Sequence, residues 1–280
     1  MKFCPAAALA VLLVASGATD ASADAASASI RGDRDQLLVV STGTYVSGID
    51  GEMTRPSPGR YEQPIDIAPG THSLLVAFNA NKFATLAMRF DAKPGGAYVI
   101  RWEQQSAAPG VTPPTQVWVE DEKSHDVVAP KRQIWPIDHN PSYVTPSGAG
   151  AATIGGSAQT DAHGPISVSL AAVDGAYTGT QDADAAKPLG VAPGLHALLI
   201  DYNSTLFGAE YPVLLDVKAA HDYVIGFTAK TSLITGVAPP HLSIWVDDTT
   251  AHERVLAEKI VPLKRLKFDT EATPPRVGKS

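Results

Sequence analysis

Apolar and polar residues alternate with a period of two along most of this chain, which is the spacing of a half-buried β-strand. The runs that show this pattern are rich in aromatic and β-branched residues. Neither half contains an apolar stripe at the 3.6-residue spacing of a helix. The pattern therefore predicts an all-β protein, whose clearest strands cover residues 72–78, 98–102, 116–120, 196–202, 223–227 and 243–247.

Turn signals separate these runs. Asp50-Gly51 and Asp174-Gly175 favour tight β-hairpin turns, because both residue types tolerate a positive φ. Ala-Pro-Gly precedes the runs at 72–78 and 196–202; its proline sets one dihedral and its glycine accepts the positive φ that reverses the chain. With turns about every 8–12 residues, each half holds about six or seven short strands, as a small β-sandwich does.

The second half of the chain repeats the first. The offset between matching residues is 124 for Asp50 and Asp174, and it grows in single steps to 127 for Trp118 and Trp245. Insertions in loops between fixed strands produce such steps, so the chain contains two copies of one unit. We predict two tandem homologous β-sandwich domains, immunoglobulin-like or prealbumin-like. The residues that recur are Asp50-Gly51, Pro69-Gly70, His72, Leu74-Leu75, Asn79, Tyr98-Val99-Ile100, Gly110-Val111, Pro113-Pro114, Trp118-Val119, Asp121 and His125.

Composition sets the boundaries of the two copies. Lys2 precedes about nine small or apolar residues, and Ala21-Ser22-Ala23 fits the small-x-small rule for signal cleavage. Residues 140–164 are rich in Gly, Ala, Ser, Thr and Pro, a composition typical of a flexible linker. The predicted organisation is a signal peptide 1–23, a disordered segment 24–36, repeat one 37–130, a linker 131–164, repeat two 165–262 and a C-terminal tail 263–280.

Charge and cysteine content argue against several classes of function. The formal net charge is −7, and this acidic excess argues against binding to nucleic acid, which favours a basic face. The one cysteine, Cys4, lies in the predicted signal peptide, so the predicted mature chain has no disulfide, no thiol nucleophile and no thiolate ligand. The N-terminal apolar run is too short to span a bilayer. We therefore expect a periplasmic or secreted protein without a transmembrane segment.

The order of turns and strands resembles exported bacterial β-domains of the PEGA type and small envelope proteins of unknown function. In those domains an IDG-like turn precedes a PG-x-H strand, and a strand that begins with an aromatic residue follows later. The matching residues here are 49–51, 67–78 and 98–100, with their counterparts in the second copy. Such modules are mostly non-catalytic, so the resemblance implies an interaction module.

Four recurring histidines are candidate metal ligands. His72 and His196 follow the Pro-Gly turns by two residues, and His125 and His252 follow the recurring tryptophans by seven. A metal needs three or four converging ligands, and neither His-x-His nor His-x-x-x-His occurs. We therefore predict no metal site, and we expect His72 and His196 to pack at a strand start and donate to a turn carbonyl.

Acidic residues end two matching strands, as Glu120-Asp121-Glu122 and as Asp247-Asp248. Two carboxylates could join in calcium binding, but the spacing of an EF-hand or of a calcium β-roll is absent. Adjacent strand residues point to opposite faces, which argues against a glycosidase pair. We expect solvated strand ends that block edge-to-edge pairing.

Aromatic residues divide into those that recur and those that do not. We expect the recurring set to lie in the core: Trp118 and Trp245, Tyr98 and Tyr223, and Phe78 and Tyr202. Aromatics outside this set could build a partner-binding surface. If these aromatics and the acidic residues that do not recur converge in one cleft, an enzyme is favoured, and if they scatter or lie flat on one sheet, binding is favoured. The candidates for partner binding are Trp102, Trp135, Tyr61, Tyr177 and Tyr211.

No catalytic or cofactor signature occurs: the G-x-S-x-G elbow, the P-loop and the G-x-G-x-x-G fingerprint are all missing. We therefore predict no enzyme and no cofactor. The leading hypothesis is a non-catalytic binding or structural accessory of the bacterial cell envelope, with a protein or glycan partner. Two similar faces at a spacing set by the linker would raise avidity. The alternatives are a carbohydrate-active enzyme or enzyme-inhibitor-like protein using carboxylates of the second repeat, and a structural role in which strand edges dock onto a larger assembly.

Overall fold

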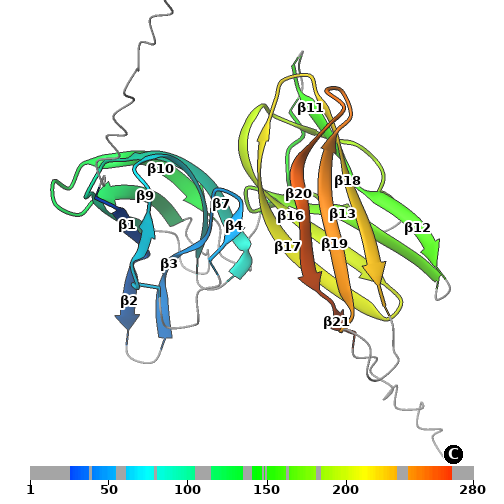
Figure 1. The fold of residues 1–280 in the computed structure, drawn as a ribbon, viewed down its shortest axis with the longest axis horizontal. Helices are drawn as coiled ribbons and strands as arrows, with labels where there is room; N and C mark the ends of the chain where they lie inside the picture. The colour runs from blue at the N-terminus through cyan, green and yellow to red at the C-terminus, as the bar shows by residue number, and fades with distance from the viewer. Residues whose placement is uncertain are drawn as a thin grey trace, which may run out of the picture.

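The computed structural model describes residues 26–37, 40–54, 61–78, 81–104, 115–134, 141–146, 148, 150–161, 164–180, 184–231 and 239–266. Within these ranges the chain is built of strands and contains no α-helix (Figure 1). The prediction of an all-β protein is confirmed.

The first half forms two sheets. Their strand orders are β10-β9-β8-β1-β5 and β2-β3-β6-β7, with the short β4 paired to β3. The strands are β1 (Ala28–Arg31), β2 (Arg34–Leu37), β3 (Val40–Ile49), β4 (Glu52–Met53), β5 (Ile65–Ile67), β6 (Gly70–Phe78), β7 (Asn81–Ala92), β8 (Ala97–Gln104), β9 (Thr115–Asp121) and β10 (Val127–Ile134).

The second half also forms two sheets. Their strand orders are β20-β19-β18-β11-β15 and β12-β13-β16-β17-β21, with β14 paired to β13. The strands are β11 (Ala152–Gly155), β12 (Ser157–Asp161), β13 (Gly164–Val173), β14 (Ala176–Tyr177), β15 (Leu189–Val191), β16 (Gly194–Ser204), β17 (Phe207–Val217), β18 (Asp222–Lys230), β19 (His241–Asp248), β20 (Glu253–Pro262) and β21 (Lys264–Arg265).

The two halves share one topology. Adding ten to each strand label of the first half gives the strand order of the second, which carries β21 in addition. The register agrees as well: β1 runs parallel to β8 with Ile30 beside Tyr98, and β11 runs parallel to β18 with Ile154 beside Tyr223. The sequence repeat is therefore also a repeat of strand order and register.

Each half encloses an apolar cluster of its own, to which both of its sheets contribute. In the first half, Ile100 and Val117 come from one sheet and Leu74 and Val76 from the other, and all four are 0% exposed. The second half has a corresponding cluster, drawn entirely from residues 152–263. Alternation along each strand puts every second side chain into these clusters.

A recurring glycine lets the first strand of each half pass from one sheet to the other. A Cβ at Gly32, between β1 and β2, would lie 2.0 Å from the carbonyl oxygen of Thr44. A Cβ at Gly156, between β11 and β12, would lie equally close to the carbonyl oxygen of Val168. Only glycine allows the two backbones to approach this closely.

Three of the predicted boundaries are wrong. Strands β1 and β2 occupy residues that we expected to be disordered, because Ile30 is fully buried in the core of the first half. Strands β11 and β12 lie inside the predicted linker, where Ile154 makes the matching contact. Leu263 and β21 continue the second half into the predicted tail. The predicted signal peptide, residues 1–23, lies outside the described residues.

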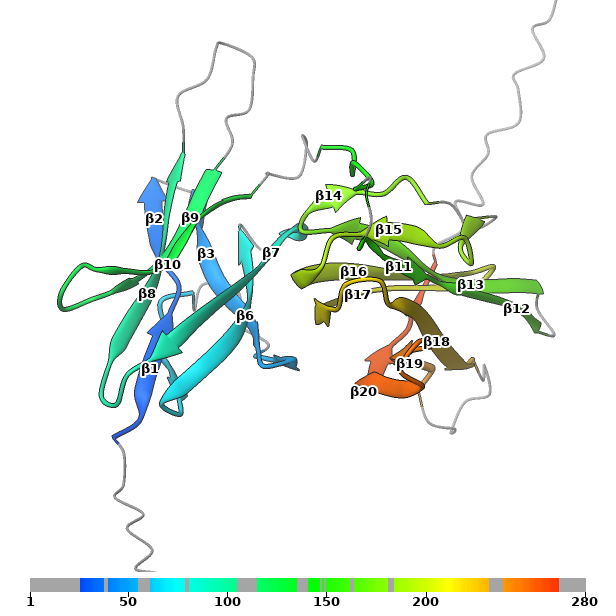
Figure 2. The ribbon, with the colours of Figure 1, turned by 90° about the horizontal axis from the view of Figure 1, so that it is seen from above.

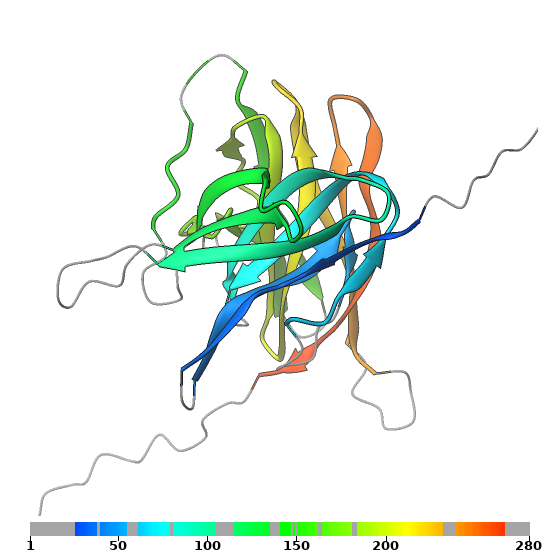
Figure 3. The ribbon, with the colours of Figure 1, turned by 90° about the vertical axis from the view of Figure 1, so that its left-hand side faces the viewer.

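The two halves pack against each other. Figure 2 shows β6 and β7 on the side of the first half that faces β16 and β17, and in Figure 3 the strands of the first half cross in front of those of the second. Leu75 and Ala87 of the first half are buried with Ala197 of the second, at no more than 1% exposure each. The halves are therefore in direct apolar contact and are not separated by a free linker.

Candidate functional site

Asp50 and His72 hold the turn between β3 and β4 against the neighbouring strand β6. The turn residues Asp50 and Gly51 both have positive φ, of 50° and 83°, which confirms the predicted hairpin. Asp50 Oδ1 accepts the backbone N–H of Ser73, at 2.8 Å. Its Oδ2 lies 2.7 Å from Nδ1 of His72, whose Nε2 lies 2.6 Å from the carbonyl oxygen of Ala68. The predicted hydrogen bond from this histidine to a turn carbonyl is present.

The second half contains the same fastening, 124 residues further on. Asp174 also has a positive φ, of 48°, and its Oδ1 accepts the backbone N–H of Ala197 at 2.9 Å. Its Oδ2 lies 2.8 Å from Nδ1 of His196, whose Nε2 lies 2.9 Å from the carbonyl oxygen of Ala192. The two halves therefore hold the same turn with the same set of hydrogen bonds.

The geometry around His72 favours its protonated form. A backbone carbonyl and an ionised carboxylate can only accept, so both ring nitrogens must donate for both hydrogen bonds to form. Burial alone would lower the pKa of His72, but the hydrogen bonds to Ala68 and Asp50 and the charge of Asp50 outweigh it, and the pKa is raised. Both histidine nitrogens are thereby occupied, and neither is presented to a metal.

The two aspartates differ in one respect. The Asp50 side chain is 50% exposed, whereas that of Asp174 is 20% exposed and lies 3.2 Å from Nη2 of Arg132 in the first half. Burial alone would raise the pKa of Asp174, but the hydrogen bond and charge of His196, the Ala197 amide and the Arg132 charge outweigh it, and the pKa is lowered. This asymmetry arises from the contact between the halves.

Acidic residues also hold the turns after β9 and β19. Asp121 Oδ1 accepts the backbone N–H groups of Lys123 and Ser124, and Asp248 Oδ1 accepts those of Thr250 and Ala251. The turns end on His125 and His252, whose φ values are 62° and 57°.

The prediction that both acidic strand ends are solvated is wrong for Asp248. This residue is 0% exposed, and its Oδ2 lies 2.7 Å from Nδ1 of His221. Burial alone would raise the pKa of Asp248, but the hydrogen bonds from the turn amides and His221 lower it. A buried carboxylate with all these partners is a structural group of the turn.

The recurring tryptophans do not lie in the core. Along β9 the buried positions are Val117 and Val119, so Trp118 between them points to the outer face of the sheet. Its ring lies 4.3 Å from Lys131 Nζ, and the Trp245 ring lies 4.7 Å from the guanidinium carbon of Arg254. Each tryptophan N–H donates to a carboxylate two residues on, Glu120 or Asp247. The prediction of core residues holds for Phe78, Tyr98, Tyr202 and Tyr223, each 1% exposed, and fails for the two tryptophans.

Of the aromatics that we expected to form a partner surface, the four that the structure describes do not form one cluster. Trp102 packs edge-on against Phe78 at the rim of the first core, with ring centroids 5.3 Å apart. Tyr61 stacks on Tyr45 at 4.9 Å, and burial together with Tyr61 raises the pKa of Tyr45 to about 12. In the second half, Tyr177 lies on β14 and is 47% exposed, whereas Tyr211 lies on β17 and packs against the core. Trp135 lies outside the described residues.

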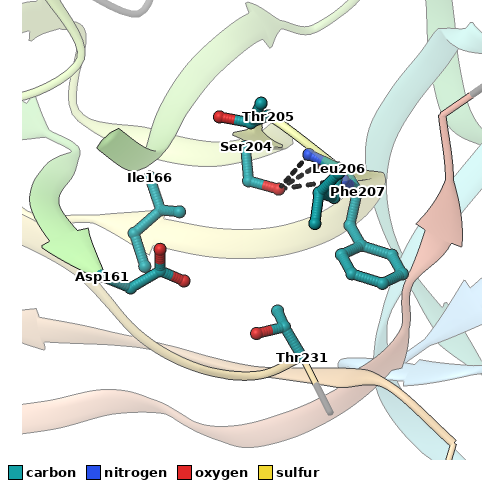
Figure 4. Close-up of a pocket in the computed structure, with 7 residues that line it drawn as sticks. All are labelled: Asp161, Ile166, Ser204, Thr205, Leu206, Phe207 and Thr231. Atoms are coloured by element: carbon teal, nitrogen blue, oxygen red, sulfur yellow. Dashed lines mark hydrogen bonds between the residues drawn. The ribbon is translucent and has the colours of Figure 1, made fainter. Parts of the chain in front are cut away.

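Two of the hollows in the second half lie beside its core. One is an open groove of about 590 Å³ along β17, lined by Asp201, Glu210, Tyr211 and Lys264 and, from the first half, by Met53. The other is a cavity of about 10 Å³ among Asp161, Ile166, Phe207 and Thr231 (Figure 4). Ser204 lines this cavity too, but its hydroxyl is occupied by the backbone of Leu206 and Phe207. The second hollow has room for about one water molecule.

Among the described residues, no three His, Cys, Asp or Glu side chains come together as ligands for a metal ion. None of these residues belongs to a helix with the length and hydropathy needed to cross a membrane.

No protein-family model matches the chain, and comparisons with curated proteins and with solved structures find no match.

Sequence reasoning did not find the residues that join the halves. Arg132 and Lys259 occupy equivalent places on β10 and β20, 127 residues apart, and each reaches the hairpin turn of the other half. The two copies are offset by 127 residues from Trp118 onward. An alignment of the strands that follow Trp118 and Trp245 would therefore have matched Arg132 with Lys259. The contacts that they make could not be predicted, because the orientation of the halves has no signal in a single sequence.

Proposed function

We propose that this chain is an exported, non-catalytic binding or structural accessory protein of the bacterial cell envelope. It consists of two tandem homologous β-sandwich domains, immunoglobulin-like or prealbumin-like, and its resemblance to PEGA-type modules favours the same class. It acts in the periplasm or outside the cell, and its partner is an envelope protein or a glycan.

The observation that carries this proposal is the use of the recurring polar side chains. Asp50 with His72 and Asp174 with His196 each satisfy backbone groups of a turn. Asp121 and Asp248 do the same in the turns after β9 and β19. The residues that the duplication retained therefore support the scaffold, which is the expectation for a module whose function lies on its surface.

The outer sheet faces are the surfaces that the two halves have in common. Trp118 and Trp245 lie at equivalent places on them, each beside a cation and a carboxylate. A tryptophan ring with polar neighbours suits both a protein partner and the face of a sugar ring. Two such faces on one chain raise avidity when both engage the same partner or polymer.

The test uses residues 24–280 as bait for an envelope fraction and for purified envelope glycans. We expect one stoichiometric protein or one glycan class to be retained. Trp118→Ala and Trp245→Ala should each weaken retention, and the double variant should lose it. Val144→Ala, at a residue that is 84% exposed and remote from both tryptophans in sequence, is the matched control and should retain the partner.

Two results would contradict the proposal. The first is that no partner is retained in either fraction. The second is turnover of a polymer substrate by the purified chain, which would make it an enzyme. Unfolding midpoints of all variants must be recorded with the binding data, because the tryptophans are half-buried and also cover the sheet.

One observation favours a second candidate, a carbohydrate-active enzyme or enzyme-inhibitor-like protein. Asp201 and Glu210 are directly opposite each other on β16 and β17 and line the open groove. Side chains opposite each other on one sheet face are close enough for a carboxylate pair to act on a glycosidic bond. Hydrolysis of an envelope glycan that is lost in both Asp201→Asn and Glu210→Gln would establish this candidate.

A further inference from the structure

Asp174 belongs to the second half but contacts the first. Its carboxylate holds the turn of its own half through His196 and the Ala197 amide. The same Oδ2 accepts a hydrogen bond from Nη2 of Arg132, whose Nη1 donates to the carbonyl oxygen of Ala87 on β7. One carboxylate thus connects the turn, strand β10 and strand β7.

The chain that enters the second half is fixed beside the same turn. The backbone N–H of Tyr143 donates to the carbonyl oxygen of Tyr177 at 2.7 Å, and that of Tyr177 donates to the carbonyl oxygen of Pro141 at 2.9 Å. The Tyr143 hydroxyl donates to the carbonyl oxygen of Gly190 at 3.0 Å. Since Tyr177 lies three residues after Asp174, this segment and the shared carboxylate fix the same hairpin.

Further contacts also hold the two halves together. Arg89 on β7 lies 2.9 Å from Asp216 on β17, and Lys259 on β20 pairs with Glu52 on β4. Between these polar contacts lies the apolar patch of Leu75, Ala87 and Ala197, joined by Met53, Leu195 and Leu214. Apolar burial ringed by ion pairs is the arrangement of a specific interface.

We infer that the two halves form one rigid body. His196 is a positioning residue for the contact between them, because His196 orients the Asp174 carboxylate that binds Arg132. The Asp174 carboxylate therefore couples two things: it holds the β13–β14 turn in place, and it binds the first half of the chain. In the first half Asp50 and His72 hold the equivalent turn, but there the contact with the other half is made by Glu52, which pairs with Lys259. If the proposed function is right, Trp118 and Trp245 are presented at a fixed relative orientation; the docking itself does not depend on that function.

The test measures the distance between spin labels in the two halves of the chain 24–280. This chain contains no cysteine, so Lys123→Cys and Thr250→Cys, both at exposed turn positions, give two unique attachment sites. We expect a single narrow distance distribution. Arg132→Gln and Asp174→Asn should broaden it, and Asp50→Asn, the matched control, should leave it narrow.

The coupling is tested separately with His196→Gln. This variant should broaden the distance distribution as Asp174→Asn does, and His72→Gln should not. Combined with Arg132→Gln, it should shift the unfolding midpoint by less than the sum of the single shifts, because both substitutions act on one carboxylate.

A broad distribution of label distances in the labelled chain without further substitutions would contradict the inference of a rigid body. A narrow distribution in Arg132→Gln would contradict it as well. Additive midpoint shifts would overturn the coupling. None of these readouts requires a partner, so a failure of the proposed function would leave them unaffected. Arg132 has a side chain that is 37% exposed, so its substitution is compatible with folding.

Discussion

Tyr202 occupies in the second half the place that Phe78 occupies in the first. Phe78 pairs with Thr44 and Tyr202 with Val168, at positions shifted by the same 124 residues, and both rings are 1% exposed. The tyrosine brings a hydroxyl into a position that the first half fills with hydrocarbon. That hydroxyl is buried, and no described residue forms a hydrogen bond of normal geometry with it.

Replacing Tyr202 by phenylalanine should therefore stabilise the protein. A buried hydroxyl without a partner costs about 1–3 kcal/mol, so Tyr202→Phe should raise the free energy of unfolding by an amount in this range. The reverse change, Phe78→Tyr, should lower it. Denaturant unfolding of both variants measures this, and a loss of stability in Tyr202→Phe would show that a water or side chain satisfies the hydroxyl.

The stability of the first half should depend on the protonation of His72. Its pKa is raised in the folded protein, so the stabilisation is complete below the unfolded pKa of about 6.5 and is lost as the pH rises through the folded pKa. The difference in unfolding free energy between the parent and His72→Gln should shrink from pH 5.5 to pH 8.5. It should amount to no more than about 1 kcal/mol, because Asp50 is half exposed. If the difference in unfolding free energy grew with pH, the predicted direction of the pH dependence would be wrong.

Asp174 should give the opposite pH dependence. Its pKa is lowered, so its contribution is present above the unfolded pKa of about 3.9 and is lost as the pH falls through the folded pKa. The charged and titratable groups that act on it or respond to it are His196, Arg132 and Tyr143. Acid unfolding of the parent should be steeper below pH 4 than that of Asp174→Asn. Superimposable acid transitions would mean that this carboxylate carries no net stabilisation.

Alanine at either crossing glycine should be severely destabilising. Gly32→Ala and Gly156→Ala each put a Cβ 2.0 Å from a backbone oxygen, and relief of that overlap must move a strand. We expect a loss of about 1–3 kcal/mol or more for each. Gly208→Ala is the control, because the nearest atom to its Cβ would be the flexible end of Leu266, at 3.2 Å, and the nearest backbone atom, the carbonyl oxygen of Tyr202, would lie at an ordinary contact distance of 3.7 Å. Thermal unfolding compares the three, and an equal effect at Gly208 would contradict the argument.

The all-β class, the duplication and the hairpin turns could be predicted because they depend on local residue patterns. The hydrogen bond from His72 to a turn carbonyl followed from its place after the Pro-Gly turn. The first strand of each copy was missed, although Ala28, Ile30 and Gly32 recur as Ala152, Ile154 and Gly156 at the same offset of 124. A four-residue strand next to a stretch rich in small residues gives too little periodicity to be distinguished from a linker.

Other features could not be predicted from local pattern. Trp118 is an outer-face residue because Val117 and Val119 beside it are buried, and a large aromatic residue is compatible with either face. The contact between Arg132 and Asp174 depends on how the halves dock, which is set by surfaces far apart in the sequence.

The recurring histidines test the central claim most directly, because the claim is that they fasten turns and bind no ligand. We would record nitrogen-detected spectra of the His72 and His196 rings in the chain 24–280, with and without added zinc. At pH 5.5 both ring nitrogens of His72 should carry a proton, and at neutral pH zinc should shift neither ring. Loss of a ring proton and movement of both rings at stoichiometric zinc would contradict the account.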